Sequence, residues 1–144
     1  MGDASEPVPN ILTGDLLELA QLVDPTEILK VGAENYIDNT QPWDSARDKK
    51  PKLVLRPRSI ASLSGIVAYL STKDLEYKVR SHGFGSASAT DVLISLSAFD
   101  DFEFNREEQY VILGAGGNWK GYYDRMEEAA PNWTSMIKPE AAVH

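Results

Sequence analysis

The sequence contains no cysteine, and this absence has the widest consequences. Without a thiol there can be no disulfide, no thiolate nucleophile and no sulfur-ligated metal site. Histidine is also scarce, since His82 and His144 are the only two in the chain. A zinc or haem centre is therefore not expected, and we predict no metal site.

Long apolar runs and a typical leader sequence are missing as well. No stretch reaches the roughly 20 apolar residues that a helix needs to cross a bilayer. Residues 1–10 are polar and acidic, unlike the basic and apolar parts of a signal peptide. From these absences we expect an intracellular protein, cytoplasmic by default, that binds no membrane.

The chain has an excess of acidic residues, with a net charge of −8 at pH 7. Such a charge disfavours binding to nucleic acid. Nine of the 14 basic residues nevertheless lie between Arg47 and Arg80, together with three acids. The length of 144 residues and the 42% hydrophobic content suit one globular domain. We expect this domain over 11–131, a flexible arm over 1–10 and an irregular tail over 132–144.

The spacing of apolar and capping residues predicts the secondary structure. Helices are expected from Thr13 to about Pro25, from Thr26 towards Tyr36, from Ile60 to about Thr72, and from Asn118 to Pro131. Strands are expected at 52–56, 76–80, 92–97, 101–105 and 109–114, the last two as a hairpin, and residues 39–50 as a loop. The predicted fold class is α+β, with helices packed on a small mixed β-sheet.

Two of the predicted helices have an apolar face at helical spacing. The face of the helix over 60–72 comprises Ile60, Leu63, Val67 and Leu70, and that of the final helix comprises Trp119, Tyr122, Tyr123 and Met126. Both faces are interpreted mainly as core. The aromatic face of the final helix could also line a ligand site.

The most informative segment is 78–88, where a strand enters a loop of residues with small side chains. Such a loop exposes backbone N–H groups, which can surround a phosphate. The alternative is a flexible turn, because a single glycine-rich loop is a weak signal. The turn over 114–117 has the same two interpretations, close approach to a cofactor or a strand-to-helix connection.

Four segments together resemble a known family. They are 53–59 (strand, Arg-Pro-Arg-Ser, helix), 79–88, 92–96 and 111–119. In this order and spacing they resemble the N-terminal part of the FAD-binding domain of the vanillyl-alcohol oxidase and para-cresol methylhydroxylase (PCMH) superfamily. The chain looks most like the berberine bridge enzyme-like, FAD-linked oxidoreductases common in fungal secondary metabolism. The resemblance covers about half of the chain and implies the first lobe of a PCMH-type domain. We expect the second lobe and the substrate domain to be lacking.

The resemblance implies FAD as the cofactor, with its pyrophosphate at the loop 80–88. The candidate cofactor-binding residues are Arg56, Arg80, Ser81, His82, Gly83, Phe84, Gly85, Ser86, Ser88, Gly114 and Gly116. Many family members bind the flavin covalently through a histidine in this loop. Phe84 occupies that position here, and there is no cysteine for a second kind of link. The FAD is therefore expected to be bound non-covalently, and this short chain could also have lost it.

Three functions remain open at this point. The first is an FAD-linked oxidoreductase, or a truncated member, acting on a small organic substrate. The second is a non-redox cyclase or isomerase that reuses the emptied cofactor cleft, with His82, Arg80 and Tyr122 as catalytic residues, since histidine titrates near neutrality. The third is a non-catalytic dimerisation or binding module. We also expect a homodimer or a partner chain to cover the face near 114–123, since a lobe that normally packs against other domains should expose apolar surface.

Overall fold

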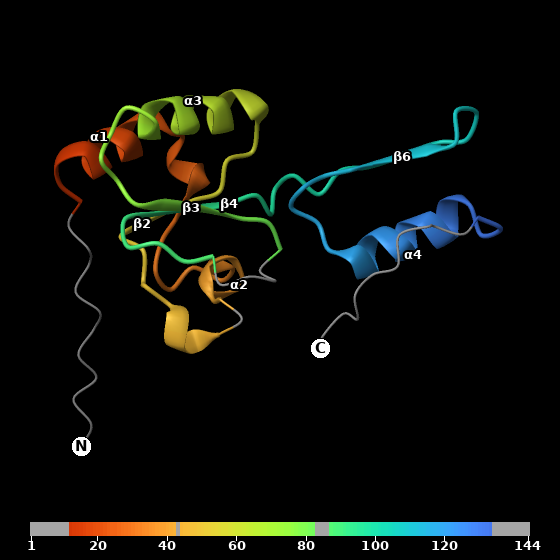
Figure 1. Ribbon diagram of the computed structural model, residues 1–144, viewed down its shortest axis with the longest axis horizontal. Coiled ribbons are helices and arrows are strands. Elements are labelled where there is room, and N and C mark those ends of the chain that lie inside the picture. The colour runs from red at the N-terminus through yellow and green to blue at the C-terminus, as the bar shows by residue number, and fades with distance from the viewer. Residues whose placement is uncertain (1–11, 43, 83–86, 134–144) are drawn as a thin grey trace, which may run out of the picture.

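The computed structural model describes residues 12–42, 44–82 and 87–133. They form a sheet with helices on both faces, and beside it a hairpin backed by one helix (Figure 1). The elements in chain order are α1 (Gly14–Leu22), the 3₁₀ turn η1 (Pro25–Glu27), β1 (Ile28–Leu29), α2 (Tyr36–Thr40), the 3₁₀ turn η2 (Ser45–Arg47), β2 (Leu53–Leu55), α3 (Ile60–Leu70), β3 (Tyr77–Arg80), β4 (Val92–Ser95), β5 (Phe102–Asn105), β6 (Tyr110–Leu113) and α4 (Trp119–Ala129).

The main sheet has four strands in the order β1-β2-β4-β3. Strand β1 is antiparallel to β2, while β2, β4 and β3 are parallel, so the sheet is mixed. Every residue of β2 and β4 is buried, as expected for parallel strands covered on both faces. Helices α1 and α3 lie over one face and α2 over the other (Figure 1). The predicted α+β class with a small mixed sheet is confirmed.

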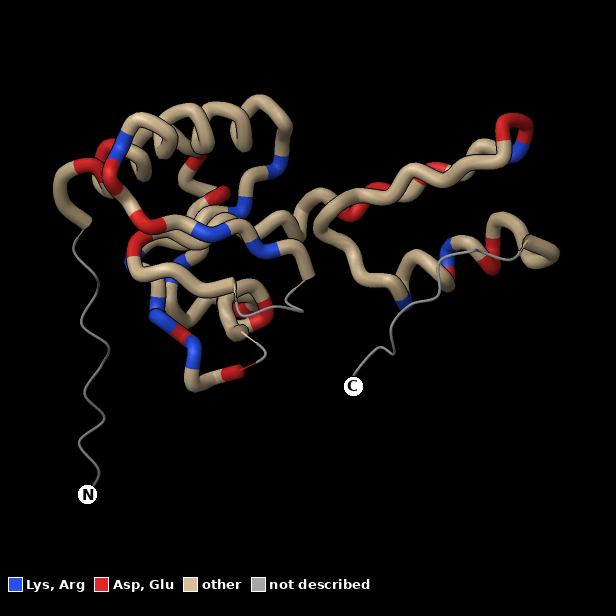
Figure 2. Tube along the Cα trace, viewed as in Figure 1, with Lys and Arg blue, Asp and Glu red and all other residues tan. Residues whose placement is uncertain are grey.

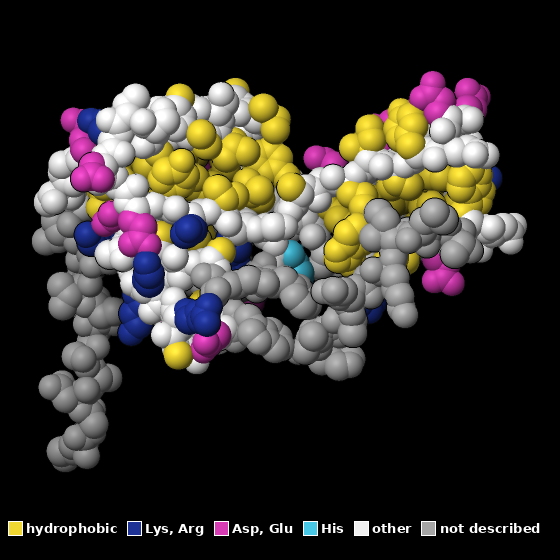
Figure 3. Space-filling model, in the orientation of Figure 1, with side chains coloured by type: hydrophobic (Ala, Val, Ile, Leu, Met, Phe, Trp, Pro, Cys, Tyr) yellow, Lys and Arg dark blue, Asp and Glu magenta, His cyan; other side chains and the backbone are white. Residues whose placement is uncertain are grey.

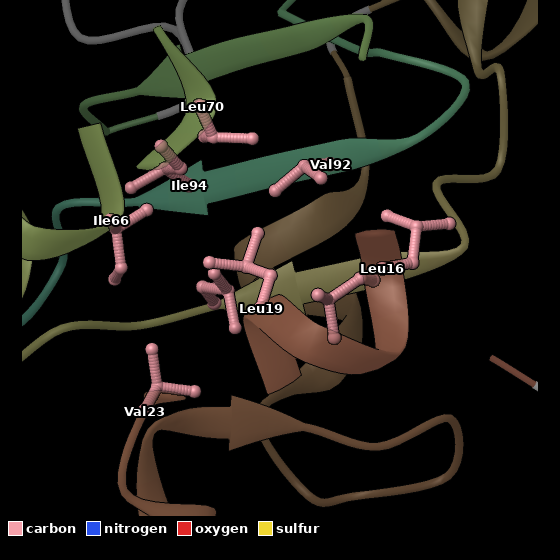
Figure 4. Close-up of a cluster of buried hydrophobic side chains, with 9 residues drawn as sticks. Leu16, Leu19, Val23, Ile66, Leu70, Val92 and Ile94 are labelled. Atoms are coloured by element: carbon pink, nitrogen blue, oxygen red, sulfur yellow. The ribbon is translucent and has the colours of Figure 1, made fainter. Parts of the chain in front are cut away.

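The core lies between the sheet and the pair α1 and α3. Alternate residues of the two central strands point to this side, and they pack with apolar residues of both helices (Figure 4). The buried cluster comprises Leu16, Leu19, Val23, Leu53, Leu55, Ile66, Leu70, Val92 and Ile94. The opposite face of β4 carries Ser95, which is bonded to Asn39 of α2. The central strand thus contacts both helical layers.

Helix α3 begins where the sequence predicts, because the Ser59 hydroxyl accepts a hydrogen bond from the Ser62 N–H at 3.1 Å. Its predicted buried face is partly wrong. Ile60 is 71% exposed and Val67 is 39% exposed, whereas Ile66 and Leu70 are buried. Apolar residues occur on two sides of this helix, so periodicity alone could not tell which side the sheet would cover.

The helix predicted from Thr26 towards Tyr36 is wrong. Ile28 and Leu29 form β1, which pairs with Leu55 and Val54. The buried carboxylate of Glu27 explains the difference, because it accepts hydrogen bonds from the Arg58 N–H at 2.7 Å and from the Ser62 hydroxyl at 2.5 Å. These long-range bonds hold 25–29 in extended contact with the end of β2. The helical turn comes later, as α2, partly within the predicted loop 39–50.

Beyond the main sheet, β5 and β6 form the predicted hairpin, with Phe102 opposite Leu113. Helix α4 packs against it through Tyr122, whose ring centroid lies 6.5 Å from that of Phe102. The helix begins at the predicted cap, since the Asn118 side chain accepts from the Gly121 N–H at 2.6 Å. It ends before Pro131. Of its predicted apolar face, Tyr122 is buried, Tyr123 and Met126 are intermediate, and Trp119 is 43% exposed.

The surface is divided by residue type. Lysine and arginine lie mainly around the sheet, whereas acids are prominent at the tip of the hairpin (Figure 2). Exposed hydrophobic side chains gather below α3 and along the hairpin with α4 (Figure 3). Among the helices of the described residues, none has the length and apolar character that crossing a membrane requires.

Candidate functional site

The parallel strands β2, β3 and β4 end at a common edge of the sheet, which we call the carboxyl edge. Arg56 follows β2, His82 follows β3 after Ser81, and Ser97 follows β4. In open sheets with parallel strands, ligands bind outside these carboxyl ends. The main sheet therefore brings together several of the residues that the sequence singled out.

A cavity of about 230 Å³ lies between the carboxyl edge and α4. It is lined by His82 and Ser97 from the carboxyl edge, and by residues of the segment before β5, the turn before α4 and α4 itself. The complete lining comprises His82, Ser97, Asp100, Gly116, Gly117, Asn118, Gly121, Tyr122 and Arg125. Three of these residues, His82, Gly116 and Tyr122, were predicted from the sequence.

The turn over 114–117 packs directly against the segment that follows β4. The Gly114 N–H donates to the Asp101 carbonyl and the Gly116 N–H to the Phe99 carbonyl, each at 2.8 Å. A Cβ atom on Gly116 would lie 1.7 Å from the Leu96 carbonyl oxygen. Glycine is therefore required here by the close approach of two backbones. Cofactor binding by Gly114 and Gly116 stays a prediction.

Tyr122 and Arg125 form the α4 side of the cavity. The Tyr122 hydroxyl donates to the Gly114 carbonyl at 2.6 Å, and burial raises the pKa of this tyrosine. Arg125 donates to the Asp100 carbonyl at 2.6 Å and lies 3.5 Å from its carboxylate. Both side chains thus fix α4 to the segments that line the cavity. His82 is exposed at the opposite wall and makes no hydrogen bond within the described residues.

Arg80 is buried, and its side chain forms hydrogen bonds with α2 and the residue that follows it. Its guanidinium donates to the Gln41 carbonyl at 2.5 Å and to the Asp38 carbonyl at 3.1 Å. Burial lowers the pKa of Arg80. A positive charge next to the last carbonyls of a short helix is favourable. The roles predicted for Arg80 in cofactor binding and catalysis stay predictions, and the structure gives the side chain two partners inside the fold.

The other predicted site residues lie near the loop. The Ser81 hydroxyl donates to the Ala115 carbonyl, which joins the end of β3 to the turn over 114–117. Ser88 is buried and accepts from the Lys49 N–H at 2.9 Å. Gly83, Phe84, Gly85 and Ser86 lie outside the described residues.

Arg56 belongs to a hydrogen-bonded chain that the sequence did not indicate. Its Nε–H donates to the Ser97 hydroxyl at 2.7 Å, and that hydroxyl donates to the Asn39 side-chain oxygen at 2.6 Å. The Ser95 hydroxyl donates to the same oxygen at 2.6 Å. The serines could have been noticed because they end a buried strand. Asn39 gave no signal, since it lies within the predicted loop.

Several solved structures share this fold. Wild-type Phl p 4.0202, a glucose dehydrogenase, has a TM-score of 0.68 and 16% identity over 82% of this chain and 27% of its own. Xylooligosaccharide oxidase from Myceliophthora thermophila C1 has a TM-score of 0.65 and 11% identity over 80% and 25%. A variant of berberine bridge enzyme has a TM-score of 0.64 and 16% identity over 80% and 26%. The chain thus spans about a quarter of each.

In sequence, the chain is similar to the FAD-dependent monooxygenase yanF of Aspergillus niger, with 22% identity over 92 residues. The match covers 60% of this chain and 16% of that protein. No protein-family model matches the chain. One of the structural neighbours is a berberine bridge enzyme, the kind of protein that the sequence resembles. The resemblance inferred from the sequence is therefore confirmed at the level of the fold.

Proposed function

We propose that this chain forms the first lobe of an FAD-linked oxidoreductase of the berberine bridge enzyme-like type, acting on a small organic substrate. The observation that supports it most directly is the cavity at the carboxyl edge, in a fold shared with FAD-binding proteins. The proposal includes a non-covalent cofactor, with its pyrophosphate near the loop 80–88. It also includes one structural unit over 11–131.

The residues at the carboxyl edge fit part of such a cofactor. The cavity of about 230 Å³ is smaller than the roughly 300–1,000 Å³ of a typical ligand pocket. It can hold one portion of a dinucleotide, whose remainder would need cover from further protein. Arg56 supplies positive charge beside it, and Asn118 and His82 supply hydrogen-bonding groups. Bound FAD would provide two-electron redox chemistry, while His82 could hold or release a proton at its imidazole nitrogen.

Visible absorption of the protein after incubation with FAD and gel filtration tests this function. We expect the spectrum of bound oxidised flavin, and we expect acid precipitation to release all the colour into the supernatant. Protein without flavin absorption after this treatment would contradict cofactor binding. Colour that stays with the precipitate would contradict the non-covalent mode.

The size of the cavity also favours a second function, a cyclase or isomerase without a redox cofactor. A space of about 230 Å³ suits a small organic molecule better than a whole dinucleotide. In that case His82 would polarise the ligand, and Arg80 and Tyr122 would either assist or position the site. The absorption experiment with FAD distinguishes the two functions, since the cyclase or isomerase function requires that FAD does not bind.

We further propose that a second copy or a partner chain covers the face around 114–123. Trp119 is 43% exposed and Ile112 of the neighbouring strand is 52% exposed. A hairpin of two strands is also of marginal stability by itself, and here α4 and the ring of Trp133 pack against it within the described residues. The module function considered from the sequence would use this same face.

A further inference from the structure

Arg56 lies at the carboxyl edge of the sheet, directly after β2. The residue is only partly exposed, and the one hydrogen bond that its side chain makes within the described residues joins Nε to the Ser97 hydroxyl. No carboxylate of the described residues forms an ion pair with it. A partly buried charge without an acidic partner favours a bound anion.

The lysines and Arg58 of the same region either pair with a carboxylate or are exposed. Lys49 pairs with Glu76, Lys52 with Asp91 at 2.8 Å, and Lys73 with Asp15 at 2.8 Å. Lys50, Arg58 and Lys78 are exposed, where water solvates the charge. Arg80 is also buried at the carboxyl edge without an ion pair, but both of its terminal amino groups donate to backbone carbonyls. Arg56 differs, because no hydrogen bond within the described residues involves its terminal amino groups.

The bond from Arg56 to Ser97 has a defined direction. The Asn39 amide nitrogen donates to the Asn35 carbonyl at 2.7 Å, which leaves its oxygen to accept. Because that oxygen can only accept, the Ser97 hydroxyl must donate its proton there, and its lone pairs remain free for the Arg56 Nε–H. The arrangement fixes the guanidinium through Nε, and its two terminal amino groups have no hydrogen-bond partner among the described residues.

The residues behind Arg56 are rigidly placed. Asn39 is 6% exposed, and its oxygen also accepts from Ser95, a buried residue of the central strand β4. Helix α2, which carries Asn39, is held by the Arg80 guanidinium through the Gln41 and Asp38 carbonyls. Ser97 itself lines the cavity. A binding group supported by a buried hydrogen-bonded chain is pre-organised, which reduces the entropy lost on binding.

We propose that Arg56 binds a phosphate or diphosphate group at the carboxyl edge, and that Ser97 and Asn39 are positioning residues for its guanidinium. The terminal amino groups donate to the anion, while Nε remains bonded to Ser97. The inference rests on the proposed function for the identity of the natural ligand, a dinucleotide cofactor. The anion site itself can be tested without a flavin.

The test measures the affinity of the full chain for inorganic pyrophosphate by calorimetry at low salt. Arg56→Gln should weaken binding by about tenfold or more, since charge-assisted hydrogen bonds are lost. Arg58→Gln is the matched control, because Arg58 is the same residue type two positions later and takes no part in the hydrogen bonds that join Arg56, Ser97 and Asn39. It should leave the affinity within about twofold. Circular dichroism and melting curves establish that each variant is folded.

Positioning is tested at Ser97 and Asn39. Ser97→Ala should weaken pyrophosphate binding by about three- to tenfold, and Ser97→Thr, which keeps the hydroxyl, should restore most of it. Asn39→Ala should resemble Ser97→Ala. If Ser97 had a structural role alone, Ser97→Ala would lower the melting temperature, and Ser97→Thr would not restore the affinity for pyrophosphate. The inference is overturned if Arg56→Gln binds pyrophosphate as well as the parent, if both arginine variants weaken it equally, or if Ser97→Thr binds no better than Ser97→Ala.

Parallel titrations with FAD and riboflavin separate this inference from the proposed function. If the protein binds pyrophosphate through Arg56 but neither flavin, the anion site stands and the flavin function fails. If it binds FAD with an affinity that Arg56→Gln does not change, the flavin function stands and the anion site fails.

Discussion

At the scale of single residues, Asp91 shows how one carboxylate joins separate segments. It accepts from the Lys52 ammonium at 2.8 Å and from the Glu76 N–H at 3.0 Å. The bond from Lys52, with the one from Glu76, lowers the pKa of Asp91 below its ordinary value of 3.8. The carboxylate therefore stabilises the fold above that value, and the contribution disappears as the pH falls through the lower pKa of the folded state.

The corresponding variant is Asp91→Asn. At pH 7 we expect its free energy of unfolding to be about 1 kcal/mol below that of the parent. Below about pH 4 the difference should shrink, because Asp91 then takes up a proton in the unfolded chain before it does so in the folded protein. Urea unfolding at a series of pH values measures it. Asp74→Asn changes an exposed acid in the same region and should have little effect at any pH. A difference that grows on acidification would contradict the assignment.

Arg80 and Asn39 also show, residue by residue, what the sequence could reveal. That Arg80 mattered was predictable, because a basic residue entering a glycine-rich loop is conspicuous. Its partners were not, since Asp38 and Gln41 offer backbone carbonyls, which every residue has. Asn39 was missed for another reason, since its side-chain oxygen accepts from Ser95 and Ser97, which are 56 and 58 positions away. Contacts between residues so far apart depend on the register of the sheet, and no local pattern encodes them.

At the scale of elements, the turn over 114–117 connects the hairpin to α4 through close backbone contact. Gly116→Ala should lower the free energy of unfolding by about 2 kcal/mol or more, because the new Cβ atom would meet the Leu96 carbonyl and cannot be accommodated without moving the turn. Thermal or urea unfolding measures the loss.

Gly65 provides the matched control for this element. It lies within α3, and an added Cβ atom there has no heavy atom within 4 Å. Gly65→Ala should therefore raise the free energy of unfolding by about 0.5–1 kcal/mol, since alanine loses less conformational entropy in a helix. Equal effects of the two substitutions would show that the turn can move freely.

The elements themselves were predictable to different degrees. The helix after Ser59 and the helix after Asn118 have capping side chains and apolar periodicity, and both begin as expected. Strand β1 was not predictable, because Ile28 and Leu29 suit a helix as well as a strand. Only the pairing with β2 and the bonds of the Glu27 carboxylate decide between them. Where long-range contacts are strong, they override the local preference of a segment for helix or strand.

At the scale of the whole molecule, the hairpin and α4 are joined to the main sheet through the turn over 114–117 and the bonds of Arg125 to Asp100. Both outer edges of the β5–β6 sheet are unpaired within the described strands. We expect light scattering to show a concentration-dependent dimer at micromolar concentrations. Ile112→Lys should favour the monomer, because a charge on an exposed apolar position opposes association. Ile60→Lys on α3 is the control, and a monomeric parent without hydrophobic dye binding would contradict the expectation.

The strand order has a consequence for the chain while it is being synthesised. Strands β2 and β3 are made first, yet they never pair with each other, since β4 lies between them. Their shared partner, Val92–Ser95, leaves the ribosome only after both. Until then neither strand has a parallel neighbour, and the core cluster to which α3 belongs lacks Val92 and Ile94. Nascent chains that stop before Val92 should therefore be sensitive to protease and attract chaperones, whereas chains that extend beyond Ser97 can close the sheet.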